Sequence, residues 1–345
     1  MSQENETVGV AVVGLGRVAH SHIDGVLQLG NKGELTAVVD VDESRAKSAA
    51  ERYNVPYYTS TSEAYAASEV DAVVICVPHD LHAQLAIEAM NAGNHVLVEK
   101  VMATSVEEGE RMVQVAKTNE VNLMIGQSRR FFPALREARE RINEIGTPLN
   151  LLYTFACHFD VDTAPPWWRS EKKTGGLVYP MLGSHSIDYT LWMLADRNPV
   201  AVFANGASNN DTFEGDDDVT LVIEFDDGTH ATNFLSINNS PSKHRGIVIG
   251  SEGSISWDQH GDHSGDLVGV ASTSLEINGE QVDRSEDEPH NFALQMREFI
   301  ESIRQRREPE ASGKEILIQL QIIEAARKSA AKNRVVRLSE ENAAE

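Results

Sequence analysis

Three small residues near the N-terminus have the spacing of a turn that binds a dinucleotide. Gly14, Gly16 and Ala19 follow the apolar run of residues 8–13, so a buried strand would turn directly into a helix here. Gly14 permits the tight turn, Gly16 lets a pyrophosphate approach the helix N-terminus, and Ala19 keeps the helix close to the strand. A glycine-capped strand–helix turn without a ligand is the alternative interpretation.

An acidic residue stands where the adenine ribose of a dinucleotide would lie. A second apolar run ends in Asp40, which is 21 residues after Ala19. A carboxylate at this place accepts hydrogen bonds from ribose hydroxyls and repels a 2′-phosphate. Asp42 adds negative charge, and Arg45 is the nearby cation. The sequence therefore favours NAD as the cofactor over NADP.

Two further side chains could exchange a proton with a substrate. Lys100 ends an apolar run, and an ammonium there could donate to a substrate oxygen and favour its alkoxide as a hydride leaves. His185 lies in the segment Gly-Ser-His-Ser-Ile-Asp, and its titration near neutrality suits a general acid or base. A solvated strand-end lysine and a buried structural histidine are the alternatives.

The elements that must hold these residues alternate regularly up to about residue 126. Strand-like and helix-like segments follow one another, which predicts a parallel sheet with helices on both faces, a doubly wound Rossmann domain. Ligands bind beyond the carboxyl ends of such strands. The strand-like runs are residues 8–13, 35–39, 71–77, 95–99 and 121–125, and the helix-like segments are 43–53, 83–91 and 106–117.

The pattern changes after about residue 127. Clustered strand-like segments with helices elsewhere predict an α+β domain on a mostly antiparallel sheet, and therefore two domains, residues 1–127 and 128–345. The clearest hairpin joins residues 219–225 to 229–237 through Asp-Asp-Gly. The other expected elements are a strand at 149–159 and helices at 131–144, 182–194, 292–304 and 316–333.

Composition excludes several classes of function. The formal net charge of −23 on 345 residues argues against binding to nucleic acid or to an anionic membrane surface. Cys76 and Cys157 are the only cysteines, so no disulfide framework is expected, and the histidines show no metal-ligand spacing, so we predict no metal. The polar N-terminus lacks a signal-peptide core, and no apolar run approaches a membrane span. We expect a cytoplasmic protein.

Four segments together resemble a known family. They are the Gly-Leu-Gly-Arg-Val-Ala turn, Val-Pro-His-Asp-Leu-His at 77–82, Val-Glu-Lys at 98–100 and the stretch from Gly-Gly at 175 to Asp188. In this order the chain resembles the glucose–fructose oxidoreductase, inositol dehydrogenase and MocA family over nearly its whole length. The resemblance implies an open sheet in the second domain and hydride transfer between NAD(P) and a CH–OH group of a sugar, cyclitol or sugar derivative.

The resemblance and the chemistry of the side chains give a set of expected contacts. Lys100 would contact the reacting oxygen, and His185 would take or return the proton. The expected cofactor contacts are Gly14, Gly16, Arg17, Val18, Asp40, Val77, Pro78, His79, His82, Glu99 and Lys100. The expected substrate contacts are Lys100, His158, Trp168, Arg169, Tyr179, Met181 and His185.

Several of these positions keep a structural alternative. His82 could serve packing, and the loop of Trp167, Trp168 and Arg169, whose indoles could stack on a sugar, could instead form a domain or subunit contact. Arg129 and Arg130 follow the last strand-like run of the first domain, where we expect a surface role at a helix start in preference to substrate binding, the alternative.

The chain departs from the family at two places. The family has proline after the lysine, where this chain has Val101, and an aspartate four residues before the histidine, where this chain has Met181. A thioether cannot orient an imidazole as a carboxylate does, although Asp188 could reach His185 at helical spacing. The change suggests an altered substrate, a slower enzyme or different chemistry with the same cofactor.

These departures leave other functions open. One is an enzyme that keeps NAD bound and uses transient oxidation to drive hydrolysis or elimination on a glycoside. Another is a nucleotide-binding regulator without catalysis. We also expect a homodimer or homotetramer, because an uncovered sheet face would expose the apolar side of strands such as 219–225.

Overall fold

The first sheet contains six parallel strands in the order β3-β2-β1-β4-β5-β6, which confirms the predicted parallel sheet and adds the short strand β3 to the five expected strands. The computed structural model describes residues 7–67, 69–262, 269–282 and 291–338. The strands are β1 Val8–Val13, β2 Gly33–Val39, β3 Tyr57–Tyr58, β4 Ala72–Ile75, β5 His95–Glu99 and β6 Leu123–Gly126. The helices between them are α1 Arg17–Leu27, α2 Glu43–Tyr53, α3 Thr61–Ala67, α4 His82–Asn91 and α5 Val106–Thr118.

The second sheet has nine strands and is mostly antiparallel, with the order β14-β13-β12-β11-β7-β10-β9-β8-β15. Only the pair β7 and β10 is parallel among its described strands. The strands are β7 Pro148–His158, β8 Pro199–Ala207, β9 Asp218–Phe225, β10 His230–Ser236, β11 Asn238–Gly250, β12 Ser254–Asp262, β13 Gly269–Ile277, β14 Glu280–Val282 and β15 Val336–Arg337. The expected hairpin is present as β9 and β10.

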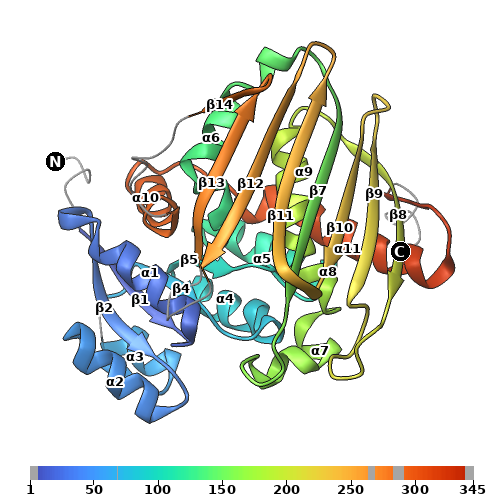
Figure 1. Cartoon of the computed structure of the whole chain (residues 1–345). Coiled ribbons are helices and arrows are strands. Elements are labelled where there is room, and N and C mark those ends of the chain that lie inside the picture. The colour runs from blue at the N-terminus through green and yellow to red at the C-terminus, as the bar shows by residue number, and fades with distance from the viewer. Residues whose placement is uncertain (1–6, 68, 263–268, 283–290, 339–345) are drawn as a thin grey trace.

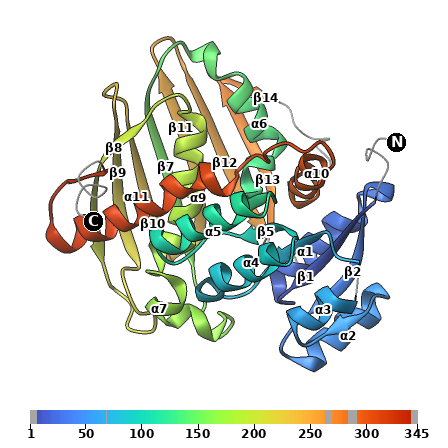
Figure 2. The ribbon, with the colours of Figure 1, turned by 180° about the vertical axis from the view of Figure 1, so that it is seen from behind.

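Helices cover one face of the second sheet. Figure 2 shows α9 (Gly183–Met193) and α11 (Gly313–Lys332) on that face, whereas Figure 1 looks onto the face that none of the described helices covers. The apolar side of β9 is buried beneath the helices, and Thr220 and Glu224 lie on its other side. Our expectation that the open face exposes the apolar side of this strand was therefore wrong, because the helices already cover it.

The helix expected at residues 131–144 is interrupted. A 3₁₀ turn at Ser128–Phe131 precedes α6 (Pro133–Glu140), and a second 3₁₀ turn follows at Ile142–Ile145. Phe132 is extended, with φ −68° and ψ 124°. Proline disfavours helical geometry in the residue before it, so the helix can begin only at Pro133.

One helix from the C-terminal part packs on the first domain. Helix α10 (Asn291–Arg304) lies against α1 in both views, and its Met296, Phe299 and Ile300 share a core with β1. The two sheets therefore belong to separate stretches of sequence, but the first domain is completed by a distant helix. None of the helices in the described part of the chain is long and apolar enough to cross a membrane.

Candidate active site

The glycine turn after β1 has the geometry of an anion-binding cradle. Gly14 has φ +83°, and a Cβ there would lie 2.6 Å from the carbonyl oxygen of Cys76. A Cβ on Gly16 would meet nothing within 4 Å, so the space over the start of α1 is open. This helix has no side-chain cap and no acidic residue in its first turn, which begins at Arg17 and Val18. Free helix N–H groups facing open space suit a pyrophosphate.

Asp40 holds the turn together from the end of β2. Its Oδ2 accepts hydrogen bonds from the main-chain N–H of Leu15 at 2.8 Å and from Arg45 at 3.1 Å, and its Oδ1 accepts from the N–H of Asp42 at 2.9 Å. A cavity of about 310 Å³ beside it is lined by Asp42, Arg45 and Arg52 among others. Both acidic and basic groups therefore lie where the adenosine part of a bound dinucleotide is expected.

Lys100 lies at the carboxyl end of β5 and reaches toward the second domain. Its Nζ donates to the carbonyl oxygen of Met181 at 3.2 Å, and the Lys100–Val101 peptide bond is cis. Burial and the charge of Arg129, opposed by the charge of Glu99, together lower the pKa of Lys100 to about 8. The ammonium is therefore a proton donor at neutral pH.

Glu99 contacts the main chain of Lys100, not its ammonium group. Its Oε2 accepts from the main-chain N–H of Lys100 at 3.1 Å, and its Oε1 accepts from Nε2 of His22 at 2.8 Å. His22 is completely buried on α1. The sequence analysis missed His22, because nothing in the local pattern shows that a residue of the first helix reaches the end of the fifth strand.

His185 lies on α9 and belongs to the same site as Lys100. Burial lowers its pKa well below the ordinary value, and the positive charges of Lys100 and Arg129 lower it further. Its Nδ1 is buried, and no hydrogen-bond partner for that atom is present among the described residues. This orphaned nitrogen is consistent with Met181 standing where the family has an aspartate. The imidazole is neutral at pH 7 and free to accept a proton.

Arg129 lies at a helix start, as expected, and is partly exposed. It follows β6 in the 3₁₀ turn, and its guanidinium lies 4.6 Å from the ring centroid of Phe155 and donates to Oε1 of Gln259 at 2.9 Å. Its charge acts on both Lys100 and His185. Arg129 is therefore a part of the site that the sequence reasoning did not find.

Arg130 and Asp188 form a buried ion pair, so two expectations are corrected. The guanidinium of Arg130 binds Asp188 through two bonds of 2.8 and 2.6 Å and donates to Glu315 at 2.5 Å. Arg130 is only 3% exposed, and the charge of Asp188 raises its pKa despite burial. Asp188 therefore joins α9 to the 3₁₀ turn that follows β6 and does not orient His185.

His79 and His82 brace the turn that follows β4, next to Val77 and Pro78. The ring nitrogens of His82 lie 2.6 Å from the carbonyl oxygen of Val101 and 2.9 Å from that of Val77. Since His82 is also completely buried, its expected cofactor contact is replaced by a structural role. His79 donates from Nδ1 to the carbonyl oxygen of Thr174 at 2.9 Å, which ties this turn to the second domain.

The aromatic loop before α9 is held by its own contacts. Trp167 packs against His79 with ring centroids 4.8 Å apart, and Trp168 packs against Phe159 at 4.5 Å. Arg169, which we expected to grip the substrate, is exposed and donates to the carbonyl oxygen of Val161 at 2.9 Å, so it closes the loop instead.

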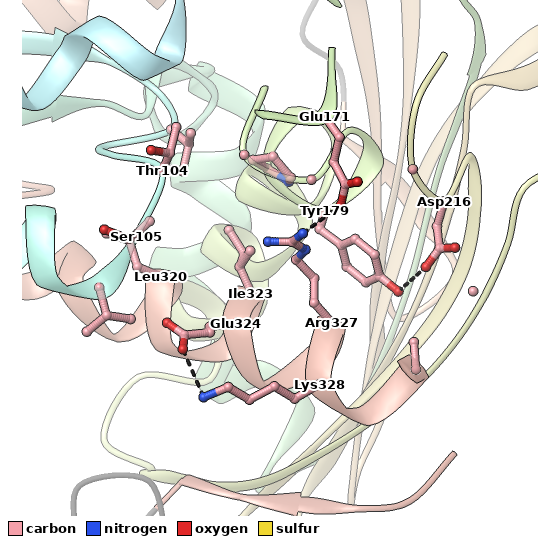
Figure 3. Close-up of a pocket in the computed structure, with 18 of the residues that line it drawn as sticks. Thr104, Ser105, Glu171, Tyr179, Asp216, Leu320, Ile323, Glu324, Arg327 and Lys328 are labelled. Carbon is pink, nitrogen blue, oxygen red and sulfur yellow. Dashed lines mark hydrogen bonds and ion pairs between the residues drawn. The ribbon is translucent and has the colours of Figure 1, made fainter. Parts of the chain in front are cut away.

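His158 and Tyr179 do not join the cluster around Lys100. His158 is exposed at the end of β7. The hydroxyl of Tyr179 donates to Asp216 at 2.8 Å and lines a separate cavity of about 720 Å³, shown in Figure 3, whose walls include neither Lys100 nor His185. The expected substrate contact of Tyr179 is therefore corrected: its helix turns the ring away from the catalytic pair.

The described residues include no cluster of three or more His, Cys, Asp or Glu side chains that could hold a metal ion. His263 and His290, which were part of the metal prediction, lie outside the described residues. Cys76 and Cys157 are buried and free, and burial raises the pKa of Cys157 to about 12, so this thiol stays protonated beside Lys100. Among the described residues, the charges of Lys100 and Arg129 therefore act on His185 in the same part of the protein.

Comparison with known proteins gives matches to both domains. Residues 8–127 match an oxidoreductase family described as an NAD-binding Rossmann fold, and residues 139–338 match its C-terminal alpha/beta domain. The scyllo-inositol 2-dehydrogenase (NAD(+)) of Bacillus subtilis is 29% identical, with 93% of this chain and 94% of that protein covered. The D-xylose 1-dehydrogenase [NADP(+)] of Haloarcula marismortui is 27% identical, with coverages of 96% and 93%.

The fold also matches solved structures. The aldose-aldose oxidoreductase from Caulobacter crescentus, complexed with glycerol, superposes with a TM-score of 0.86, 23% identity, and coverage of 96% of this chain and 99% of that one. At this identity the similarity demonstrates a shared fold.

Proposed function

Because the chain belongs to the glucose–fructose oxidoreductase, inositol dehydrogenase and MocA family of oxidoreductases, we propose that it is an NAD(P)-dependent dehydrogenase acting on a CH–OH group of a sugar, cyclitol or sugar derivative. What supports this proposal is that Lys100, at the carboxyl edge of the first sheet, donates to Met181, four residues before His185, and that the charge of Lys100 lowers the pKa of His185. The two residues come from different domains, and the glycine turn lies on the same edge.

The two side chains have complementary proton states at neutral pH. NAD(P) held by the glycine turn and Asp40 would supply a hydride acceptor for substrate oxidation and a hydride donor for the reverse reaction. The ammonium of Lys100 donates to the reacting oxygen and stabilises its negative charge. The neutral imidazole of His185 takes the hydroxyl proton, and Nε2 is the nitrogen left for it, because Nδ1 is buried. In the reverse direction the same groups return the proton.

The proposed cofactor is NAD. The carboxylates of Asp40 and Asp42 lie at the end of β2 and disfavour a 2′-phosphate. Arg45 and Arg52 beside the same cavity are the features that favour NADP. Calorimetric titration with both cofactors tests this choice, and tighter binding of NADP would reverse it.

The test of the proposed function is cofactor reduction measured by absorbance against inositols, aldoses and their derivatives. Lys100→Met and His185→Ala should each lower turnover by about 10²–10⁴-fold, because each removes one partner of a proton transfer. Binding of NAD should stay nearly unchanged in both variants. Wild-type turnover that both variants retain would contradict the assignment.

The same assay distinguishes the proposed dehydrogenase from the two alternative functions, a hydrolase or lyase with bound NAD and a non-catalytic regulator. NAD that copurifies, together with glycoside cleavage and no net NADH, would point to hydrolysis or elimination assisted by a bound cofactor. NAD binding with no turnover across the whole panel would point to a regulator.

We also propose that the chain forms a homo-oligomer through the open face of the second sheet. Leu152, Phe234 and Ile249 are 44%, 40% and 38% exposed on adjacent strands β7, β10 and β11. Pairing with a second copy would remove this apolar surface from water. Sedimentation should show a dimer or tetramer, and Phe234→Glu should shift it toward monomer; a wild-type monomer at micromolar concentration would contradict this. The two free cysteines agree with a cytoplasmic location.

A further inference from the structure

Lys100 and Arg129 are two cations of the candidate site, and the part of the chain that the structure describes gives neither of them an ion-pair partner. Glu99 is the acid whose charge acts on Lys100, but its two oxygens bind His22 and the main-chain N–H of Lys100 itself. The positive charge at this site is therefore left for a ligand to balance.

The contacts of Arg129 hold its guanidinium in place without neutralising it. The face of Phe155 packs against it at 4.6 Å, and Gln259 accepts one hydrogen bond at 2.9 Å. Both partners are neutral. A guanidinium fixed in this way presents its remaining N–H groups in a planar fork, which matches the geometry of a carboxylate.

Two observations make the charge specific to this site. Lys100 contacts the carbonyl oxygen of Met181, a residue with an uncharged side chain at the position where the resemblance implies an aspartate. The chain as a whole carries a net charge of −23, which repels anions. Two cations held by neutral contacts in such an acidic protein favour an anionic ligand at this site.

We propose that the substrate carries a carboxylate and that Arg129 binds it, so that the enzyme acts on a sugar acid or a related polyhydroxy acid. This inference rests on the proposed dehydrogenase function and names the substrate class for it. Lys100 is needed at the reacting oxygen, which leaves one guanidinium for the rest of the substrate. One cation balances a single negative charge, so a carboxylate fits better than a phosphate.

The test compares substrates that differ only at C6. D-galacturonate and D-galactose form one pair, and D-glucuronate and D-glucose form another. With saturating cofactor, kcat/KM for each acid should exceed that for its neutral partner by about 10- to 100-fold, as expected for a charge-assisted bidentate contact. Glucose 6-phosphate is the third arm, and a preference for it over glucuronate would overturn the carboxylate assignment.

Substitutions of Arg129 test whether its guanidinium causes the preference for acids over neutral sugars. Arg129→Gln should lower kcat/KM for the acids by about 10- to 100-fold more than kcat/KM for the neutral sugars, so that the preference for acids is lost. Arg129→Lys should give an intermediate loss, because an ammonium keeps the charge without the fork. Arg141→Gln, which removes an arginine paired with Glu144, is the matched control. It should change kcat/KM neither for the acids nor for the neutral sugars. Equal losses on acids and neutral sugars would overturn the inference.

A binding measurement separates this inference from the proposed function. Calorimetry of the NADH complex should give a tighter Kd for galacturonate than for galactose, and Arg129→Gln should abolish the difference. Turnover of neutral sugars without any preference for acids would overturn the inference and leave the dehydrogenase in place. Acid binding that depends on Arg129, without cofactor reduction by any substrate, would support the inference and count against the dehydrogenase.

A change of charge at position 181 gives an independent test. Met181→Asp should restore the negative charge and lower the preference for acids by about tenfold, whereas Met181→Asn, of similar shape but neutral, should keep it. Thermal unfolding of both variants checks that they are folded. An unchanged preference in a folded Met181→Asp variant would contradict the charge argument.

Discussion

Two adjacent arginines, Arg129 and Arg130, occupy opposite environments in this protein. Arg130 is buried, bound to Asp188 through two hydrogen bonds and joined to Glu315. Arg129 is partly exposed, has the neutral partners Phe155 and Gln259, and faces the catalytic lysine. Arg130 connects α9 and α11 to the end of β6, whereas Arg129 leaves its charge available beside Lys100.

The difference teaches how one short turn serves both stability and chemistry. Both arginines lie in the 3₁₀ turn after β6, where successive side chains point about 120° apart. One side chain is therefore directed into the contact between the domains, and its neighbour is directed into the candidate site. A buried arginine with two carboxylates stabilises the assembly of the domains, whereas an arginine without one is available for a ligand.

The largest expected effect is on stability, at Arg130. Arg130→Met should lower the free energy of unfolding by about 3–5 kcal/mol, because it leaves Asp188 charged and buried without a partner. Denaturation with guanidinium chloride measures the change. The double variant Arg130→Met with Asp188→Leu should recover most of the loss, since no buried charge remains unpaired. A loss below about 1 kcal/mol in the single variant would show that the pair is not structural.

The second effect is on the pH dependence of turnover. The pKa of Lys100 is lowered to about 8, so the ammonium that donates to the reacting oxygen is present below that pH and lost above it. We expect kcat/KM for substrate oxidation to fall about tenfold per pH unit above pH 8. The pKa of His185 is lowered well below its ordinary value, so no loss is expected between pH 6.5 and 7.5. Rates that still rise above pH 9 would identify neutral Lys100 as the base.

The smallest effect is the stability change at Arg129. Arg129→Met should change the free energy of unfolding by no more than about 1 kcal/mol, because only neutral contacts are lost. The same denaturation experiment as for Arg130 gives the direct comparison. A loss of about 3 kcal/mol would mean that Arg129 is also a structural residue and that its role in the candidate site is secondary.

Much of the fold could be predicted from local patterns. The Rossmann sheet was predicted from alternating apolar runs, and the hairpin of β9 and β10 from strand alternation around a glycine turn, because these signals lie within a few residues of each other. The break before Pro133 was missed although its cause is local. The place of α10 on the first domain could not be predicted, because its partner α1 is remote in sequence.

The sequence alone determined the glycine turn, the acidic residue after β2 and the lysine at a strand end, because each depends on the chemistry of a few consecutive residues. Only the tertiary structure decided what those residues meet. It paired Asp188 with Arg130 instead of His185, turned Tyr179 toward Asp216, and placed Arg129 beside the catalytic pair. The physical reason is that a side chain's direction and its neighbours arise from packing between distant segments, which no local spacing records.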